Sequence, residues 1–305
     1  MRQGKGSKTP GPVGTKIMID FHTHPVLIQE LAKKYPDYER ASREVFHIGN
    51  NFQPLETFFL QMDVAGIERA VLLPIDCRRA RKLAVSSNEQ VAELCQGSSR
   101  FIGFASVDPR RKGAAKELQD AVEKLGLRGV KLDPALQDFA PSDPRAFAVY
   151  EVAEALGIPA LVHAGMSWAP ETPLERCHPL LFEPPVRRFP KLNFVLAHFG
   201  WPWVWDAIAM ALKYPNVYLD TSSLYYDSPK EFFQFVFSKQ VPTTLIERSL
   251  RNKVVFGSNY PRVEIKNMVH ALRSLALTEG CLHKIFVENA ERLLARPEPQ
   301  RMRRK

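Results

Sequence analysis

The chain has 305 residues, of which 45% are hydrophobic, 25% charged and 10% aromatic, and this ordinary globular composition excludes a disordered, collagen-like or coiled-coil protein. The formal net charge is +9, but residues 1–17 hold four basic and no acidic residues, and residues 296–305 hold five basic residues and one acidic residue. The interior is therefore nearly neutral, which argues against a nucleic-acid-binding face. We expect two basic flexible tails, residues 1–16 and 296–305, around one domain at residues 17–295.

From residue 17 onward, short apolar runs alternate with longer amphipathic segments. The expected strands are Ile17–Phe21, Ala70–Pro74, Phe101–Val107, Gly129–Leu132, Ala160–Val162, Asn193–Ala197, Val217–Leu219 and Lys253–Phe256. The expected helices are Pro54–Ala65, Asn88–Cys95, Ala114–Leu125, Pro144–Leu156, Trp201–Lys213, Lys230–Phe237, Glu264–Ala276 and Leu282–Leu294. Eight apolar strands alternating with helices predict an α/β fold, a single (β/α)8 TIM barrel whose active site lies at the C-terminal ends of the strands.

Cysteine spacing and hydropathy predict a soluble, cytoplasmic protein. The four cysteines are widely spaced and form no CxxC pair, which is typical of reduced thiols. The basic N-terminal tail lacks the apolar stretch of a secretory signal. Trp201–Leu212 is the most apolar helical stretch, and it is interrupted by Asp206 and too short for a bilayer span. We expect a small-molecule substrate, no membrane or specific nucleic-acid partner, and a possible homodimer.

Polar residues fall at the predicted strand ends. They are His22 and His24 after the first strand, Lys131 on the fourth, His163 on the fifth, His198 on the sixth, Asp220 on the seventh and Asn259 after the eighth. Side chains alternate along a strand, so His22 and His24 point the same way and can reach one metal ion. Alone, the His22-x-His24 pair is equally compatible with a structural role in the core, and His163 or His198 by itself would more often be a core histidine. Their convergence at one barrel mouth favours a metal centre, and the other four histidines (His47, His178, His270 and His283) are expected to be incidental.

Six motifs in order make the chain similar to the amidohydrolase superfamily, in its amidohydrolase-related branch of metal-dependent hydrolases and decarboxylases. The resemblance covers Ile17 to Leu294. The motifs are Met18–Pro25, Phe101–Pro109, Gly129–Leu132 together with the His163 and His198 segments, Asn216–Asp220, Val255–Pro261 and Asn289–Leu294. The resemblance implies His22, His24 and His163 as ligands of one divalent metal ion, zinc before manganese or another ion. It also implies His198 as a second-sphere acid/base or substrate-polarising residue. Lys131 matches a lysine that some superfamily members carbamylate to bridge two metals. One metal is the commoner arrangement in this branch, and Lys131 would then orient substrate or support the metal ligands from behind.

The chain departs from the family pattern at Asn259, where the pattern has an aspartate that binds metal and takes a proton from water. An amide oxygen can still bind a metal, but it carries no charge and is no base at neutral pH. Three hypotheses remain: a natural variant whose base is another group, such as His198; an engineered Asp→Asn form; or a degenerate, non-catalytic member. We therefore keep Asn259 as a candidate metal ligand and catalytic residue.

Aromatic residues are frequent in the loops after the strands, including the long segment Val26–Gln53. They either pack the loops together or form an aromatic-walled pocket to which Trp201 contributes. Arg262 and Lys131 could then bind a substrate carboxylate. The leading prediction is a metal-dependent hydrolase of a small cyclic or aromatic carboxylate. The alternatives are a carboxy-lyase of the same family and, from another class, a non-catalytic ligand-binding barrel.

Overall fold

The computed structural model describes residues 17–222 and 228–295. Its strands are β1 (Ile19–Thr23), β2 (Arg69–Leu72), β3 (Phe101–Gly103), β4 (Val130–Leu132), β5 (Ala160–Val162), β6 (Phe194–Leu196), β7 (Val217–Asp220) and β8 (Val254–Val255). Its α-helices are α1 (Gln29–Lys34), α2 (Pro36–Arg40), α3 (Leu55–Ala65), α4 (Arg78–Arg81), α5 (Asn88–Gly97), α6 (Ala114–Leu125), α7 (Pro144–Ala155), α8 (Glu183–Arg188), α9 (Val204–Lys213), α10 (Pro229–Gln234), α11 (Thr243–Leu245), α12 (Ile265–Arg273), α13 (Glu279–His283) and α14 (Asn289–Leu294). Short 3₁₀ or π turns are η1 (Ala41–Val45), η2 (Leu174–Cys177), η3 (Pro179–Phe182), η4 (Ala197–Gly200), η5 (Phe235–Gln240), η6 (Ile246–Leu250) and η7 (Lys284–Glu288).

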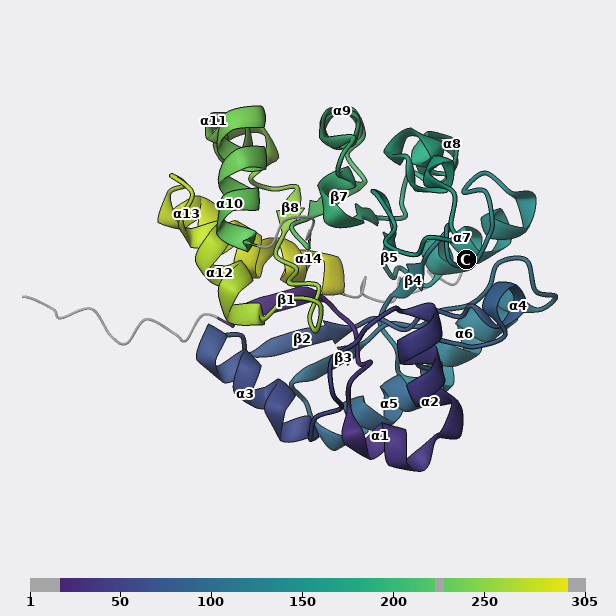
Figure 1. The fold of residues 1–305 in the computed structure, drawn as a ribbon. Coiled ribbons are helices and arrows are strands. Elements are labelled where there is room, and N and C mark those ends of the chain that lie inside the picture. Colours follow the sequence, from purple (N-terminus) through teal and green to yellow (C-terminus); the bar gives the residue numbers. More distant parts are fainter. Residues whose placement is uncertain (1–16, 223–227, 296–305) are drawn as a thin grey trace, which may run out of the picture.

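The strands pair in sequence order and close into a barrel. Strands β1–β2–β3 and β4 to β8 form two parallel runs. The runs join where the Lys131 N–H donates to the Ala105 carbonyl at 2.7 Å, and the ring closes where the Phe21 N–H donates to the Phe256 carbonyl at 2.8 Å. Helices surround the strands on the outside (Figure 1). The predicted (β/α)8 barrel is therefore confirmed.

Two apolar layers line the two faces of the strands. The inner layer fills the barrel with alternate strand residues such as Val71, Leu161 and Val255, whereas the residues between them pack against the helices. The last helix, α14, belongs to the inner layer through Leu293 and Leu294. Its Leu294 carbonyl accepts a hydrogen bond from Arg128, which precedes β4. Helix α14 therefore covers the N-terminal end of the barrel and leaves the opposite end for a functional site.

The expected elements lie where the sequence places them, with ends that shift by a few residues. The larger differences are in helices: the segments expected at Lys230–Phe237 and Leu282–Leu294 are interrupted by π turns, and α9 begins at Val204 because Pro202 precedes it. All four cysteines are free, as expected. In the described part of the chain, no helix combines the length and apolar character needed to cross a bilayer.

A bulge in β1 directs its histidines into the barrel mouth. Asp20 pairs with Ala70 but Thr23 pairs with Leu72, so β1 contains one more residue than β2 over this stretch. Bulges are frequent beside active sites, where they redirect a side chain. Ile19 and Phe21 point into the barrel interior, and after the bulge the inward direction passes to His22 and His24.

Candidate metal centre

His22 and His24 face each other through their Nε2 atoms. Their Nε2 atoms are 3.1 Å apart. His24 Nδ1 lies 2.8 Å from the Leu73 carbonyl oxygen, and His22 Nδ1 lies 2.9 Å from Asp220 Oδ2. A carbonyl or carboxylate oxygen only accepts, so each Nδ1 carries the proton and donates it. Each neutral ring therefore presents an Nε2 lone pair to the other, a contact that a cation between them would stabilise.

His163 and His198 extend this arrangement from β5 and the turn after β6. His198 Nδ1 donates to the Ser222 carbonyl, so its Nε2 accepts, and His163 Nδ1 donates to it across 3.1 Å. His163 Nε2 is left as a buried lone pair without a hydrogen-bond partner among the described residues. Among the described residues, no hydrogen-bond donor faces the Nε2 atoms of His22, His24 and His163, so each of these atoms has a lone pair available. These are the three ligands that the sequence analysis predicts, and Nε2 is the atom each has available.

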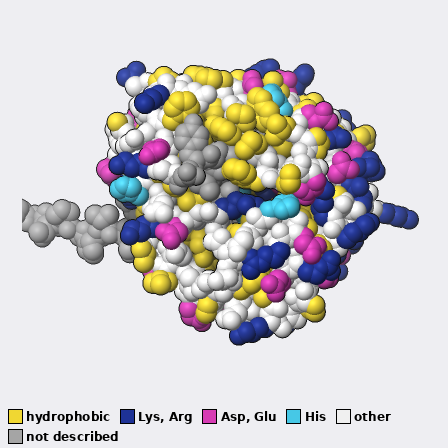
Figure 2. Space-filling model, viewed as in Figure 1, with side chains coloured by type: hydrophobic (Ala, Val, Ile, Leu, Met, Phe, Trp, Pro, Cys, Tyr) yellow, Lys and Arg dark blue, Asp and Glu magenta, His cyan; other side chains and the backbone are white. Residues whose placement is uncertain are grey.

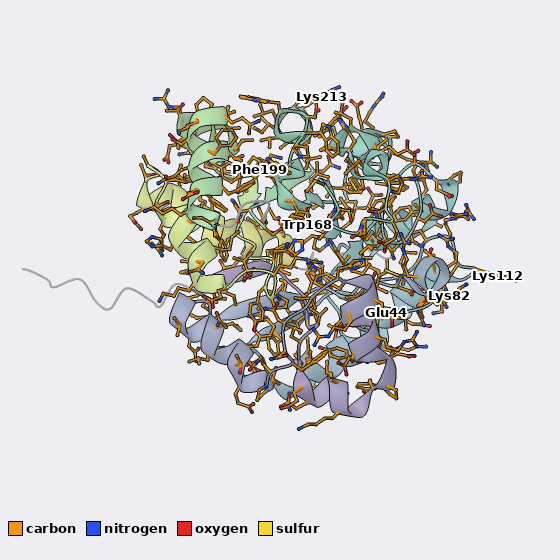
Figure 3. All side chains as sticks on the ribbon, viewed as in Figure 1. Glu44, Lys82, Lys112, Trp168, Phe199 and Lys213 are labelled. Atoms are coloured by element: carbon orange, nitrogen blue, oxygen red, sulfur yellow. The ribbon has the colours of Figure 1, made fainter. Side chains whose placement is uncertain are left out.

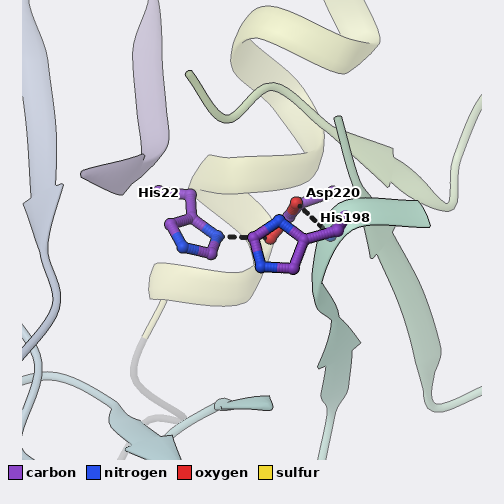
Figure 4. Close-up of side chains that lie close together, drawn as sticks. All are labelled: His22, His198 and Asp220. Atoms are coloured by element: carbon purple, nitrogen blue, oxygen red, sulfur yellow. Dashed lines mark hydrogen bonds and ion pairs between the residues drawn. The ribbon is translucent and has the colours of Figure 1, made fainter. Parts of the chain in front are cut away.

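Asp220 supports the histidines through hydrogen bonds from behind. Its Oδ1 accepts hydrogen bonds from the backbone N–H groups of His198 and Ser222, each at 2.9 Å, and from the Ser222 hydroxyl. Figure 4 shows Asp220 linked to both His22 and His198, and among the described residues these three are the group whose ligand-type atoms all lie within 4.8 Å of one another. We interpret this second group as support, because hydrogen bonds already occupy Asp220 and the Nδ1 atoms that face it.

Burial keeps all four imidazoles uncharged. Burial and the nearby Lys131 charge lower the pKa values of His22 and His163, the latter to about 3. Burial also lowers the pKa of His24, and burial beside the His163 ring lowers that of His198 to about 3. At neutral pH the rings are therefore neutral, the form that binds metal.

A pocket opens above the histidines at the C-terminal ends of the strands. Its lining residues are His24, Val45, Phe46, His47, Ile75, Lys131, Asp133, Leu136, His163, Met166, Ser167, Trp168, Ala169, His198, Asn259 and Arg262. Figure 2 shows basic side chains and a histidine at the centre of this face, with hydrophobic side chains gathered beside them. Figure 3 places Trp168 near the centre of the same face. The pocket combines apolar walls with a few converging polar groups, as small-molecule sites do.

A family model described as amidohydrolase matches residues 19–296. The chain belongs to the amidohydrolase family. Members of this family are metal-dependent enzymes, and they include decarboxylases. No curated protein matches the sequence.

Solved structures share the amidohydrolase barrel. An uncharacterised TIM-barrel protein from Bordetella bronchiseptica is 25% identical, with a TM-score of 0.73, and covers 91% of this chain and 98% of its own. A 2,6-dihydroxybenzoate decarboxylase from Rhizobium is 20% identical, with a TM-score of 0.64 and coverage of 92% and 98%. A dihydroxybenzoic acid decarboxylase from Polaromonas, with bound manganese and the inhibitor 2-nitroresorcinol, is 20% identical, with a TM-score of 0.62 and coverage of 92% and 96%.

Asn259 occupies the position that the amidohydrolase pattern gives to an aspartate, and it lines the pocket. Its backbone is left-handed, with φ of 62°, and its N–H donates to the His22 carbonyl at 2.9 Å. Asparagine and aspartate tolerate this conformation better than most residues, so the position accepts either side chain. The geometry therefore keeps the amide beside the histidines.

Of the three residues predicted to bind substrate, two line the pocket and Trp201 does not. Lys131 is 1% exposed and Arg262 is partly buried, and both line the pocket. Trp201 is outside the lining among the described residues; its ring contacts Phe232 with centroids 6.0 Å apart, and its carbonyl accepts from the Met166 N–H. A direct substrate contact by the Trp201 side chain stays a prediction.

Several residues of the amidohydrolase site escaped the sequence analysis. Asp133 follows Lys131 by two positions, a spacing that could have indicated it, and its Oδ2 lies 3.7 Å from His163 Nδ1. Asp220 stands at a strand end, where the sequence predicts no specific role for it, and its carboxylate hydrogen-bonds to His22. Phe46 and His47 come from the long segment Val26–Gln53, and His47, expected to be incidental, lines the pocket because this segment folds back over the barrel mouth. No periodicity in that segment signals the contact.

Proposed function

We propose that this protein is a metal-dependent carboxy-lyase that removes CO2 from a small aromatic or cyclic carboxylic acid. The observation that carries the proposal is the pocket itself: neutral imidazoles at its floor, two cationic side chains beside them, apolar walls, and an amide at Asn259 where a base for water would stand. The aromatic-acid decarboxylases that share the fold support the same substrate class.

The residues present fit one divalent ion. Three buried Nε2 lone pairs, from His22 and His24 at the end of β1 and from His163 just after β5, lie at the same end of the barrel, and each ring is oriented by a hydrogen bond through its other nitrogen. Such oriented neutral imidazoles suit zinc or manganese, and the Asn259 amide oxygen would be a fourth, weaker ligand. When bound, the ion would act as a Lewis acid that orients the substrate and accepts negative charge.

Lys131 and Arg262 would bind the substrate carboxylate or an acidic ring substituent. Burial lowers the pKa of Lys131, whereas the charges of Asp133 and Asp220 act in the opposite direction. Arg262 presents a planar guanidinium that can bind a carboxylate through two parallel hydrogen bonds. The aromatic and aliphatic walls, including Phe46 and Trp168, would exclude water from the ring.

Asn259 favours loss of CO2 over hydrolysis. Hydrolysis needs a group that takes a proton from the attacking water, and an amide cannot do so. In decarboxylation, the bond between the ring carbon and the carboxyl carbon breaks, its electron pair stays on the ring carbon, CO2 leaves and that carbon takes up a proton. This reaction needs stabilisation of negative charge and a proton donor. His198 lines the pocket, and because its ring is neutral and its Nδ1 proton is donated to the Ser222 carbonyl, it would relay a proton taken from solvent or from the acid substrate to the ring carbon.

A direct test measures metal content and products together. The purified protein is titrated with Zn²⁺ and Mn²⁺, then incubated with 2,6-dihydroxybenzoate and related benzoates while CO2 release is followed, and with aromatic lactones while acid release is followed. CO2 from benzoates would support the lyase. Acid release from lactones alone would replace it with a hydrolase. Failure to take up either ion would overturn both enzyme functions and favour a ligand-binding barrel.

A further inference from the structure

The guanidinium of Arg262 rests on the ring of Phe46. Its central carbon lies 4.2 Å from the centroid of that ring, and its Nη2 donates a hydrogen bond to the Phe46 carbonyl. Phe46 is 4% exposed, and its ring also lies 4.7 Å from the imidazole of His24. One residue thus contacts both a predicted metal ligand and a predicted carboxylate-binding side chain.

The segment that carries Phe46 is tied down on both sides. Ser42 donates its hydroxyl proton to the Val26 carbonyl at 2.6 Å. Arg43 donates to the Ile48 carbonyl at 2.8 Å and to the Asn50 carbonyl at 2.6 Å. Residues on both sides of Phe46 are therefore hydrogen-bonded, which restricts the movement of its ring and carbonyl.

Restricting the movement of Phe46 matters because the Arg262 side chain that packs on it is long and flexible. A free arginine side chain loses about 2 kcal/mol of rotamer entropy when a ligand immobilises it. A guanidinium already stacked on a ring and bonded to a carbonyl has lost that freedom before the substrate arrives, so more of the carboxylate interaction contributes to affinity.

We propose that Phe46 is a positioning residue that holds the Arg262 guanidinium over the pocket and thereby sets the preference for carboxylate-bearing ligands. The inference rests on the proposed function for the identity of the ligand, but the contact between the two side chains does not depend on it. Phe46 acts through Arg262 and takes no part in bond breaking.

The first test needs no substrate. Phenylglyoxal modifies exposed arginines, and the rate of modification at Arg262 can be followed by mass spectrometry of the peptide that contains it. Phe46→Leu keeps an apolar side chain and the backbone carbonyl but removes the aromatic face. We expect Arg262 to react about fivefold faster in F46L, and at the parent rate in F46Y, which restores the face.

Phe59 supplies the matched control. It lies on α3, where it stacks under Arg100 at 5.5 Å, away from the pocket lining and from the segment that carries Phe46. F59L should leave the Arg262 rate unchanged. An equal rate in F46L and the parent protein would overturn the proposal, and so would equal increases in F46L and F59L, because they would indicate that the whole fold has loosened.

The second test asks whether Phe46 affects carboxylate binding through Arg262, and it does so without measuring catalysis. Calorimetry measures binding of 2,6-dihydroxybenzoate and of resorcinol, which lacks the carboxylate, to metal-loaded parent, F46L, R262A and the double variant. We expect F46L to weaken the benzoate about fivefold and resorcinol little, with no further loss in the R262A background. Additive losses would contradict action through Arg262. If the parent binds neither probe, the proposed substrate class fails while the phenylglyoxal result still decides the role of Phe46.

Discussion

The Nε2 atoms of His22 and His24 lie 3.1 Å apart, and the Nδ1 atom of each ring is bonded to an oxygen that can only accept. Two neutral rings arranged in this way direct lone pairs at each other, so we expect both to bind one cation. Loss of an outer partner of a metal ligand costs about 10–100-fold in affinity, and loss of the ligand itself should cost more. His24→Ala should therefore abolish high-affinity Zn²⁺ or Mn²⁺ uptake in calorimetric titrations. His270→Ala, on the exposed face of α12, should bind as the parent does, and unchanged affinity in H24A would refute the ligand assignment.

Asn259→Asp should tighten metal binding by about tenfold or more, because it places a negative charge beside a dication in a poorly hydrated site. The left-handed backbone at this position accepts aspartate, so the fold should be unaffected. Competition titration with a chelator measures the change. If the variant gains activity that the parent lacks, the parent is a catalytically impaired member. Equal activity in both would assign the proton transfer to another group, and equal metal affinity would indicate that residue 259 does not reach the ion.

Glu171 joins three loops at the pocket mouth. Its Oε1 lies 3.3 Å from His47 Nε2 and 3.8 Å from Arg81 Nη1. These pairs are about one-third exposed, so Glu171→Gln should change the free energy of unfolding by less than about 1 kcal/mol. It should nevertheless speed amide hydrogen exchange at residues 45–47 and 166–169, which line the pocket. Glu175→Gln, exposed in the same loop, should not; equal exchange in the two variants would argue against the connection.

Tyr150 buries a hydroxyl that has no hydrogen-bond partner among the described residues, whereas the Tyr38 hydroxyl donates to the Pro25 carbonyl and accepts from the Ile28 N–H. An unpaired buried polar group destabilises the fold by about 1–3 kcal/mol, and a paired one stabilises it by about 1 kcal/mol. Tyr150→Phe should therefore raise the free energy of unfolding by about 1 kcal/mol, and Tyr38→Phe should lower it by about the same amount. Urea denaturation measures both, and a destabilised Y150F would imply a water or other partner at that hydroxyl.

Acid should weaken the fold partly through Asp76. Burial raises the pKa of Asp76, but hydrogen bonds and charge from Arg78, with the charge of Arg111, outweigh burial and hold the pKa below its ordinary value of 3.8. The stabilisation is therefore complete above pH 3.8 and is lost as the pH falls through the lower pKa of the folded state. Asp76→Asn should lose about 2 kcal/mol of unfolding free energy at pH 7, a difference that shrinks in stronger acid. The exposed Asp37→Asn should change little at any pH, and a D76N deficit that persists undiminished in strong acid would contradict the charge-based account.

Local patterns in the chain predicted the barrel and the histidine cluster. Apolar runs at strands, amphipathic patterns at helices and the His22-x-His24 spacing are properties of neighbouring residues, and they need no knowledge of distant contacts. The order of the strand ends then brings His163 and His198 to the same mouth, because parallel strands in a barrel all end on one side. The ends of the helices were less predictable, since π turns such as η5 and η7 depend on packing.

The amino-acid sequence by itself determined which residue types stand at the strand ends: three candidate metal ligands, a lysine on the fourth strand, and an amide at 259 in place of an acid. Only the tertiary structure decided what those residues contact. His22 and Asp220 are 198 positions apart, and their hydrogen bond fixes which ring nitrogen of His22 is available. Phe46 and Arg262 are 216 positions apart and meet because an aperiodic segment folds over the mouth. Such contacts arise from loop paths and side-chain packing, which no local spacing encodes.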